Sequence, residues 1–443
     1  METFLIRALQ LVMSLSLLVI IHEGGHFLFA RLFKTRVEKF CLFFDPWFTL
    51  FKFKPKNSET EYGIGWLPLG GYVKIAGMID ESMDLEQMKQ PMQPWEFRAK
   101  PAWQRLLIMV GGVLFNFLLA LFIYSMILFT WGDEYIPVQK APLGMDFNET
   151  AKAIGFQDGD ILISADGVPF ERYDGDLLTS IVDARQVSVL RNGKATSIYI
   201  PEDMMNRLLA DSVRFASFRF PFVIDSVGVG RPAAIAGLQV GDSITHMDGK
   251  AIAYYDFKEE MLNRQKANAS HEVNLTYVRN GVTDTLSITT DANYEIGVAA
   301  RTATDKLLPV IHKKYSFLSS FPAGASLGIK TLKGYVGQMK YLFSKEGAKQ
   351  LGGFGTIGSI FPATWDWYQF WYMTAFLSII LAFMNILPIP ALDGGHVLFL
   401  IYEIIARRKP SDKFMEHAQM VGMFLLFALL IWANFNDILR YFF

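Results

Sequence analysis

The sequence predicts a polytopic α-helical membrane protein with four transmembrane helices and two smaller α/β domains inserted between the second and the third helix. Three observations support this prediction. Apolar residues make up 51% of the 443 residues and charged residues only 19%, whereas soluble proteins usually carry about 25% charged residues. The apolar residues are concentrated in long runs near both ends of the chain. The region between those ends is ordinarily charged and contains an internal repeat.

Composition excludes several other classes of protein. The formal net charge is −1, so the basic surplus typical of nucleic-acid binders is absent and we expect no nucleic-acid partner. The high apolar content argues against a disordered chain. Cys41 is the only cysteine, which excludes an intrachain disulfide framework and a cysteine-ligated zinc finger. The partner that the composition favours is the lipid bilayer.

Four apolar runs are long enough to cross about 30 Å of hydrocarbon. The first begins near Phe4 and continues to Phe33 without a small-residue cleavage site, so we interpret it as a retained helix and not as a signal peptide. The other three runs contain no Asp, Glu, Lys or Arg, and they are Leu106–Gly132, Trp367–Leu392 and Ala418–Asn436.

Basic residues flank the runs unevenly and predict their orientation, because short cytoplasmic segments are enriched in Lys and Arg. We therefore expect residues 31–102 and 404–416 to be cytoplasmic. Both termini and residues 133–366 are then extracytoplasmic, in a multi-pass protein of a bacterial inner membrane. The basic residues that carry this argument are Arg31, Lys34, Arg36, Lys39, Arg407, Arg408, Lys409 and Lys413.

The central region repeats itself. Residues 151–167 and 233–249 match at an offset of 82 residues, and two later Asn-Gly pairs, ending at Gly193 and Gly281, match at an offset of 88. Two homologous units are therefore expected, one with a six-residue insertion. Each unit should contain a short helix, a Gly-Asp turn, a strand, an Asp-Gly turn and an Asn-Gly hairpin. The identical pairs are Gly155/Gly237, Gly159/Gly241, Asp160/Asp242, Asp166/Asp248 and Gly167/Gly249.

The first apolar run contains the pattern H-E-x-x-H, at His22-Glu23-Gly24-Gly25-His26. The i, i+4 spacing places both imidazoles on one face of a helix, where they can bind one metal ion, and Glu23 can accept a proton from water beside them. A carboxylate inside a bilayer is costly, so its presence indicates a function. The two glycines permit close approach of a neighbouring helix or of a substrate.

A third ligand is needed, because catalytic zinc usually has three protein ligands and one open position. Asp393, at the end of the third run, is the remaining candidate for a carboxylate within the membrane, in NILPIPALDGGH at 385–396. Pro388 and Pro390 should break the helix there, and broken backbone at membrane depth requires protein or a polar cavity around it. His396 is the rival ligand, although Asp393 lies nearer the break.

The cytoplasmic segment EYGIGWLPLGGYVKIAG, at 61–77, is rich in glycine and aromatic residues. Its Gly-Gly pair would suit a hairpin. The segment could enter the bilayer beside the metal and offer a strand edge to an unwound substrate. An ordinary cytoplasmic hairpin is the alternative.

These motifs resemble known families. The repeats resemble bacterial PDZ domains, the second copy more closely than the first. The whole chain resembles the site-2 proteases, and within them the bacterial RseP-type intramembrane zinc proteases with tandem PDZ domains. The matching motifs are HEGGH at 22–26, LPLGGYVKIAG at 67–77, GGVLFNF at 111–117 and NILPIPALDGGH at 385–396. Val113 stands where this family usually has proline.

The resemblance implies roles for individual residues. Zn²⁺ would be bound by His22, His26 and Asp393, and Glu23 would be the general base. Asn385 would contact the substrate backbone or the oxyanion, and Asn116 would make a lesser polar contact. Residues 61–77 would be a membrane-reentrant β-loop, in which Gly70, Gly71 and Tyr72 contact substrate.

The resemblance also implies an activity, regulated intramembrane proteolysis of single-pass membrane proteins. Anti-sigma-factor-like proteins are the expected substrates, after a first cleavage elsewhere, and remnant signal peptides are a second class. The PDZ-like pair would act as a substrate-size filter. A catalytically silent membrane scaffold that binds peptides through the PDZ-like pair is the alternative, and a transporter is disfavoured because no inverted repeat of the spans is visible.

The expected division of the chain follows from these assignments. It comprises the first transmembrane helix (1–33), a cytoplasmic segment with the β-loop (34–103), the second transmembrane helix (104–132), PDZ-like domain 1 (133–213), PDZ-like domain 2 (214–300), an extracytoplasmic linker with an amphipathic helix (301–366), the third transmembrane helix with the LDG motif (367–403), a cytoplasmic link (404–416) and the fourth transmembrane helix (417–443).

Overall fold

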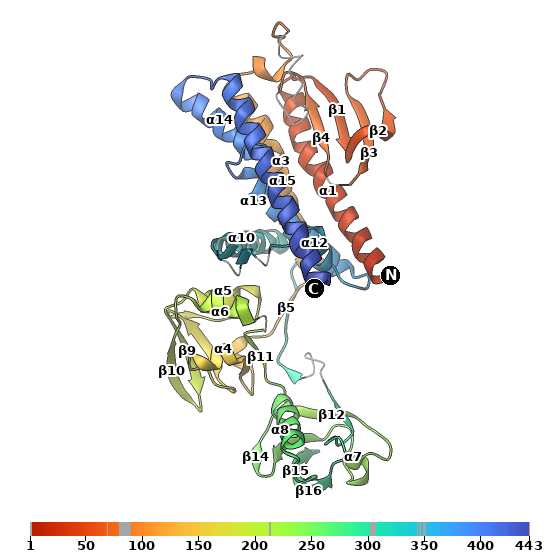
Figure 1. Ribbon diagram of the computed structural model, residues 1–443, viewed down its shortest axis with the longest axis vertical. Coiled ribbons are helices and arrows are strands. Elements are labelled where there is room, and N and C mark those ends of the chain that lie inside the picture. The colour runs from red at the N-terminus through yellow and green to blue at the C-terminus, as the bar shows by residue number, and fades with distance from the viewer. Residues whose placement is uncertain are drawn as a thin grey trace. The chain divides into compact units, whose positions relative to one another are not determined.

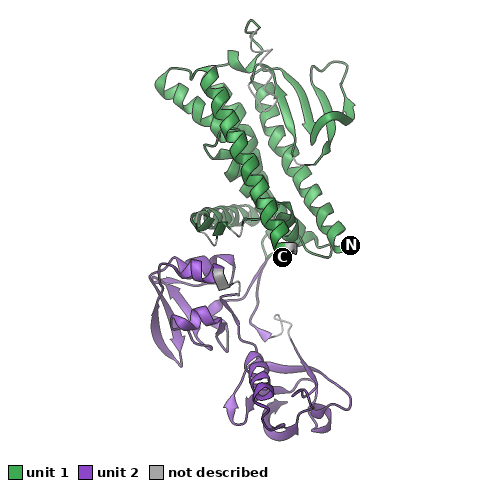
Figure 2. Ribbon diagram, in the orientation of Figure 1, with its two compact units in different colours: residues 1–132, 314–443 green, residues 133–313 purple. Residues whose placement is uncertain are grey.

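The computed structural model describes residues 2–68, 70–78, 90–211, 214–301, 307–342, 344, 347–348 and 351–442. The chain divides into two compact units (Figure 2). Unit 1 combines Met1–Gly132 with Lys314–Phe443, and unit 2 is Asp133–Lys313. Both ends of the sequence therefore build one unit, and the repeat region builds the other.

Four long helices dominate unit 1 (Figure 1). They are α1 (Glu2–Leu32), α3 (Ala102–Thr130), α13 (Trp367–Ile386) and α15 (Asp412–Phe442). Within the described residues, these are the helices that are long and apolar enough to cross a membrane, which confirms the four expected spans. The last helix begins at Asp412, earlier than the expected start at residue 417.

The third apolar run is interrupted, as the two prolines predicted. Helix α13 ends at Ile386 and α14 (Asp393–Ala406) begins after a six-residue break. The helices α10 (Phe317–Leu342) and α12 (Phe354–Ser359) also precede this region. Figure 1 shows α10 lying across the long helices. It packs on α3 through Gly324 and Gly328, where an added Cβ would meet Ser125 and Leu121.

A four-stranded sheet follows α1 in unit 1. Its strands are β1 (Val37–Leu42), β2 (Phe44–Phe53), β3 (Glu61–Leu67) and β4 (Tyr72–Ile75), in the order β2-β3-β1-β4. A short 3₁₀ helix, η1 (Phe97–Ala99), leads towards α3.

The hairpin expected at Gly70-Gly71 is wrong. Strand β1 lies between β3 and β4, parallel to the former and antiparallel to the latter. The connection must therefore cross two interstrand spacings of about 4.8 Å each, which a two-residue turn cannot span. Residue 69, within the expected β-loop at 61–77, lies outside the described residues.

Unit 2 contains two halves with the same order of elements. The first half comprises β6 (Met145–Phe147), α4 (Glu149–Ala153), β7 (Ile161–Ala165), β8 (Val168–Pro169), α5 (Gly175–Val182), β9 (Gln186–Arg191), β10 (Lys194–Tyr199), α6 (Met204–Asp211) and β11 (Ala216–Phe218). The second comprises β12 (Phe222–Val227), α7 (Pro232–Ile235), β13 (Ser243–Met247), β14 (Lys250–Ala251), α8 (Tyr254–Ala267), β15 (Glu272–Arg279), β16 (Val282–Thr289) and β17 (Val298–Ala300). Helix α6 has no counterpart in the second half among the described residues.

The remaining elements of unit 2 lie outside the two halves. They are β5 (Asp133–Tyr135), which pairs with β18 (Ile311–Lys313), and a 3₁₀ helix, η2 (Val138–Lys140).

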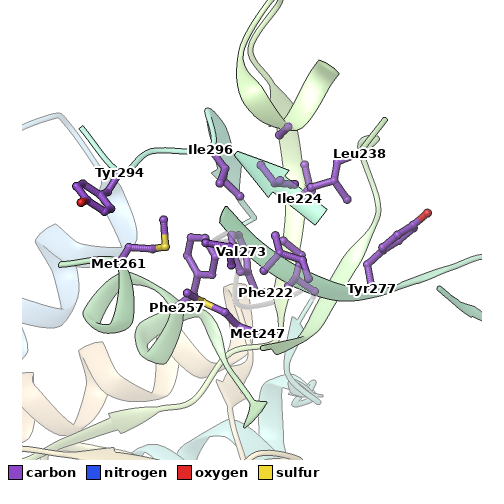
Figure 3. Close-up of a cluster of buried hydrophobic side chains, with 14 residues drawn as sticks. Phe222, Ile224, Leu238, Met247, Phe257, Met261, Val273, Tyr277, Tyr294 and Ile296 are labelled. Atoms are coloured by element: carbon purple, nitrogen blue, oxygen red, sulfur yellow. The ribbon is translucent and has the colours of Figure 1, made fainter. Parts of the chain in front are cut away.

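The six extra residues of the second half are distributed around its long helix. Helix α8 has 14 residues and its counterpart α5 has 8. Helix α8 begins 79 residues after α5 and ends 85 residues after it, so the connection before the helix is shorter in the second half and the remaining extra residues follow the helix. The helix packs on the sheet through Phe257 and Met261, in the apolar core of that half (Figure 3). Burial of such side chains stabilises the half by about 2 kcal/mol each.

An ion pair recurs at matching positions in the two halves. Arg191 donates two hydrogen bonds to the buried carboxylate of Asp160 and one to the carbonyl of Gly155. Arg279 makes the same three bonds to Asp242 and Gly237. Each pair joins the Gly-Asp turn to the strand before the Asn-Gly hairpin. The charge and hydrogen bonds of Arg279 hold the pKa of Asp242 below its ordinary value.

The first prediction concerns this ion pair. Arg279→Met should destabilise the second half by about 2 kcal/mol at pH 7, because it leaves a buried carboxylate without its partner. A carboxylate with a depressed folded-state pKa stabilises at neutral pH, and this contribution is lost as the pH falls below about 4. The measurement is urea-dependent hydrogen exchange of β13 and β15 in the full chain, at pH 7 and at low pH.

Arg301→Met is the matched control, because Arg301 pairs with the largely exposed Asp225 in the same half. It should change stability by less than about 0.5 kcal/mol. Equal effects of the two substitutions would contradict the importance of the buried pair.

Candidate active site and metal centre

The two histidines of the H-E-x-x-H motif lie on one buried face of α1. His22 is 8% exposed and His26 is 7% exposed. Their Nε2 atoms are 3.3 Å apart. The i, i+4 spacing on one helix produces this convergence without further help from the fold.

Asp393 meets both histidines from the first turn of α14. Its Oδ2 atom lies 3.1 Å from Nε2 of His22 and 3.3 Å from Nε2 of His26. Among the described residues, these three form the group of His, Cys, Asp and Glu side chains able to hold a metal ion together. The break between α13 and α14 turns the chain so that Asp393 can face α1.

The donor set and its spacing fit zinc. Tetrahedral ligands about 2.0–2.1 Å from one zinc ion lie roughly 3.3 Å from one another. The three ligand atoms are separated by 3.1 to 3.3 Å. Asp393 Oδ2 is buried and has no conventional hydrogen-bond donor, as expected of an atom that binds a cation. Two imidazoles and one carboxylate also leave a fourth position open, as in catalytic zinc sites.

The other ring nitrogens are held by α3. Nδ1 of His26 lies 2.8 Å from the carbonyl of Ile108, so it carries the proton and leaves the Nε2 lone pair available. Nδ1 of His22 lies 3.3 Å from the side-chain amide of Asn116. The atom nearest the ring is the amide nitrogen, which donates; a 180° rotation of the amide would let its buried, unpartnered oxygen accept the Nδ1 proton instead.

Asn116 therefore has a different contact from the one expected. Its side chain is fully buried behind His22, and its backbone carbonyl accepts a hydrogen bond from Ser378 of α13. At this position the side chain lies against the imidazole of His22 and is closed to solvent. The family resemblance identified the residue, but the partner of its side chain depends on how α1 and α3 pack.

Glu23 lies beside the three ligand atoms but outside their group. It is within electrostatic range of His22, His26 and Asp393, and the backbone amide of Val73 donates a hydrogen bond to it. Val73 belongs to β4, an edge strand of the sheet in unit 1. The sheet is therefore attached directly to the carboxylate expected to move protons.

Asn385 reaches the site from the last turn of α13. Its Nδ2 atom lies 3.4 Å from Nε2 of His22. Asn385, the expected substrate contact, thus lies just before the helix break. Asp393, the expected metal ligand, lies just after it. Both side chains approach the same face of α1.

The residues Gly70, Gly71 and Tyr72 lie against β1 and α1. A Cβ on Gly71 would be 2.6 Å from the carbonyl oxygen of Cys41 and 2.6 Å from a methyl group of Val19, one turn before Glu23. Gly70 has a φ of +153° and faces the ring of Phe44. This part of the expected β-loop is therefore close to the site.

The side chain of Tyr72 is occupied within the sheet. Its hydroxyl donates a hydrogen bond to Asp45 and lies 3.3 Å from the ammonium of Lys39. Burial and the neighbouring carboxylate raise the pKa of Tyr72. Only the backbone of this residue is available to pair with another strand, so a side-chain contact with substrate is not supported.

His396 lies elsewhere. Its Nε2 atom is 3.0 Å from the side-chain amide of Gln419 in α15, so the rival ligand is directed away from the two histidines. Other histidines pair with neighbours far from the site in sequence, such as His271 with Thr290 and His312 with Glu134.

Close packing of α1 on α3 brings the ligands and their partners together. A Cβ on Gly25 would overlap the carbonyl of Gly111, whereas nothing lies within 4 Å of one on Gly24. A Cβ on Gly112 would be 2.7 Å from Cε1 of His22. The sequence predicted that both glycines of the motif permit close approach of a neighbouring helix or of a substrate, and Gly25 is the one that meets a neighbouring helix. That prediction did not include Gly112, although a small residue within GGVLFNF was a signal for close contact.

Apolar helices that enclose two histidines, an aspartate beside both of them and an adjacent glutamate are typical of a metallopeptidase of the membrane. The profile described as Peptidase family M50 matches residues 10–429. Metalloprotease MmpA of Caulobacter vibrioides is 26% identical, over 99% of this chain and 96% of its own. The regulator of sigma E protease of Haemophilus influenzae is 26% identical, over 97% and 98%. The regulator of sigma-E protease RseP of Salmonella typhimurium is 26% identical, over 97% of each chain.

The chain belongs to peptidase family M50 and is a zinc metalloprotease. This confirms the resemblance to the site-2 proteases and the expected cofactor. It also disfavours the catalytically silent scaffold.

The second prediction tests the packing of α1 on α3. Gly25→Ala should lower the zinc content and reduce proteolysis at least tenfold, because the added methyl group pushes α1 away from α3 and separates the histidines from their partners. Zinc per protein, measured on the purified chain by atomic emission, is the primary readout. Gly24→Ala is the matched control on the adjacent residue and should retain zinc and activity. Similar zinc loss in both variants would contradict this account.

Proposed function

We propose that this zinc metalloprotease cleaves single-pass membrane proteins inside the bilayer, at a centre formed by His22, His26 and Asp393. The convergence of three ligand atoms at zinc-like spacing carries the proposal. The two histidines belong to α1, which has the length and composition of a membrane span. Asp393 begins the helix that follows α13, another candidate span. Charged and polar groups at this depth are costly unless they serve a function.

The proposed chemistry assigns a separate task to each residue. Bound zinc would supply Lewis acidity, which activates water and polarises a carbonyl group. Glu23, next to the ligands but not among them, accepts a proton from the attacking water and then donates it to the leaving amine. His26 and His22 keep their Nε2 atoms directed inwards through Ile108 and Asn116.

Strand β4 is the proposed docking element for the scissile segment. A transmembrane helix uses its own backbone hydrogen bonds, so it must unwind before its peptide bonds can be cleaved. An edge strand offers backbone groups to such an extended segment. The amide of Val73 already points to Glu23 from this strand, and Asn385 is placed on the opposite side of His22 to donate to the substrate backbone or to an oxyanion.

Unit 2 is the proposed filter. The basic flanks of the spans favour an extracytoplasmic location for it, in a bacterial inner membrane. Its two halves have matched elements and matched ion pairs, which supports two PDZ-like modules. We propose that they exclude substrates that retain a bulky outer domain.

The names of the relatives guide the substrate proposal. Two of them are named regulators of sigma E, so membrane-spanning anti-sigma-factor-like proteins are the first class, after a first cleavage has removed their outer domains. Remnant signal peptides share the relevant feature, a single short apolar span, and are the second class.

The third prediction tests the chemistry. Glu23→Gln should abolish cleavage of a tagged single-pass substrate while zinc stays bound, because the amide cannot accept the proton but leaves the three ligands in place. Immunoblotting of the fragment and metal analysis of the same preparation give both results. Equal fragment accumulation in wild type and Glu23→Gln would refute the protease mechanism.

Two further variants in the same assay test the ligand set. Asp393→Asn should lower both zinc content and cleavage, whereas His396→Ala should retain zinc. The reverse result would mean that the third ligand is His396.

The fourth prediction concerns the filter. Deletion of residues 133–313 should preserve cleavage of an already trimmed substrate and raise cleavage of the same substrate with its outer domain intact. The ratio of the two cleavage rates is the measurement. Loss of cleavage of the trimmed substrate would instead indicate that unit 2 is required for docking.

A further inference from the structure

The loop between α13 and α14 connects Asn385 to Asp393 and is tightly folded. Leu392 donates a backbone hydrogen bond to Ile389, and Gly395 donates one to Leu392. Ala391 has a φ of +76°, a conformation that residues with a Cβ seldom adopt. Such strain persists only where surrounding structure imposes it. The contacts of the loop therefore determine where Asp393 lies.

Two glycines of α14 press against this loop from one side. A Cβ on Gly394 would overlap the carbonyl of Leu387, and one on Gly395 would lie 2.7 Å from the carbonyl oxygen of Ile389. Backbone therefore meets backbone directly, with no side chain between them to absorb a displacement. A shift of the loop must move the start of α14, where Asp393 is located.

Helix α15 closes the loop from another side through Gly422. A Cβ at this position would overlap the carbonyl of Pro390 and lie 2.9 Å from its Cβ. One turn earlier, Gln419 is bonded to His396 of α14. Helix α15 thus contacts the chain three residues before Asp393 and three residues after it.

Among the described residues, the buried positions of α15 fall in two places, and these contacts are one of them. Within 413–440, the buried residues are Gln419, Gly422, Ala433 and Asp437. Asp437 accepts hydrogen bonds from Gly353 and Thr356 at α12. Most of the helix between these places is exposed. The contact at Gly422 reaches the loop directly before Asp393, whereas the bond from Gln419 reaches α14 after it.

We propose that Gly422 is a positioning residue for the metal centre: its lack of a side chain lets α15 support the Pro390 carbonyl and so fixes Asp393 opposite His22 and His26. This inference rests on the proposed zinc ligands and adds a residue that makes no contact with metal or substrate. A methyl group at this position must displace either the loop or α15. The loop is the strained element, and displacing it moves Asp393.

The fifth prediction tests this role with a readout other than proteolysis. Gly422→Ala should weaken zinc binding at least tenfold, measured by chelator competition on the full chain in detergent. Reconstituted with Co²⁺, the variant should have a shifted d–d absorption spectrum, because this spectrum reports ligand geometry. Ala428→Val, a substitution at an exposed position of the same helix, is the matched control and should match wild type in affinity and spectrum.

If Gly422→Ala kept the zinc affinity and the Co²⁺ spectrum of the wild type, the positioning role would be refuted, but the metal centre would not. Failure of the wild-type chain to bind either metal would overturn the metal centre and this inference with it.

A second measurement needs no variant at Gly422. If α15 supports the Asp393 loop, zinc should slow hydrogen exchange at residues 419–424 relative to the chelated wild-type chain, because the coupling between the two sites is reciprocal. Residues 428–432 should be unaffected. Equal exchange of 419–424 with and without zinc would overturn the proposal.

Discussion

The direct contact between the backbones of α1 and α3 is the constraint on which the rest of the site depends. Gly25 and Gly111 leave no side chain between the helices. At this separation, α3 can hold the outer nitrogens of His22 and His26 through Asn116 and the Ile108 carbonyl. Among apolar helices in lipid, close packing and hydrogen bonds replace the hydrophobic effect as the source of association. The contact that joins the helices therefore also places the hydrogen-bonding partners of both imidazoles.

Backbone segments connect the remaining parts of the site to α1 and α3. Strand β4 reaches Glu23 through the amide of Val73, and the strained loop before α14 brings Asp393 to the histidines. Rigid attachment of this kind suits a reaction in which the ligands, the proton acceptor and the substrate segment must be held in fixed relation. Side chains that the family resemblance associated with substrate, such as Tyr72 and Asn116, instead stabilise that arrangement.

Unit 2 is stabilised in a different way, by apolar cores and buried ion pairs. Its two halves are built from short strands and helices around ordinary apolar cores (Figure 3). A buried carboxylate in each half is neutralised by an arginine from a strand. The matching bonds of Asp160 and Asp242 show why a Gly-Asp turn and a distant arginine occur together in both copies. The second half has a longer helix, and this arrangement is unchanged there.

The sequence by itself predicted the spans, the two matched halves, the helix break and the three residues that converge as a candidate metal centre. These features depend on local patterns: uncharged length, turn residues, prolines and the i, i+4 spacing of two histidines. Only the tertiary structure decided that Gly25 and not Gly24 meets a neighbouring helix, that β1 separates β3 from β4, that Asn116 serves His22, and that Asp393 and not His396 faces the histidines. Each of these depends on which face of an element meets another segment far along the chain, and this follows from packing and not from local pattern.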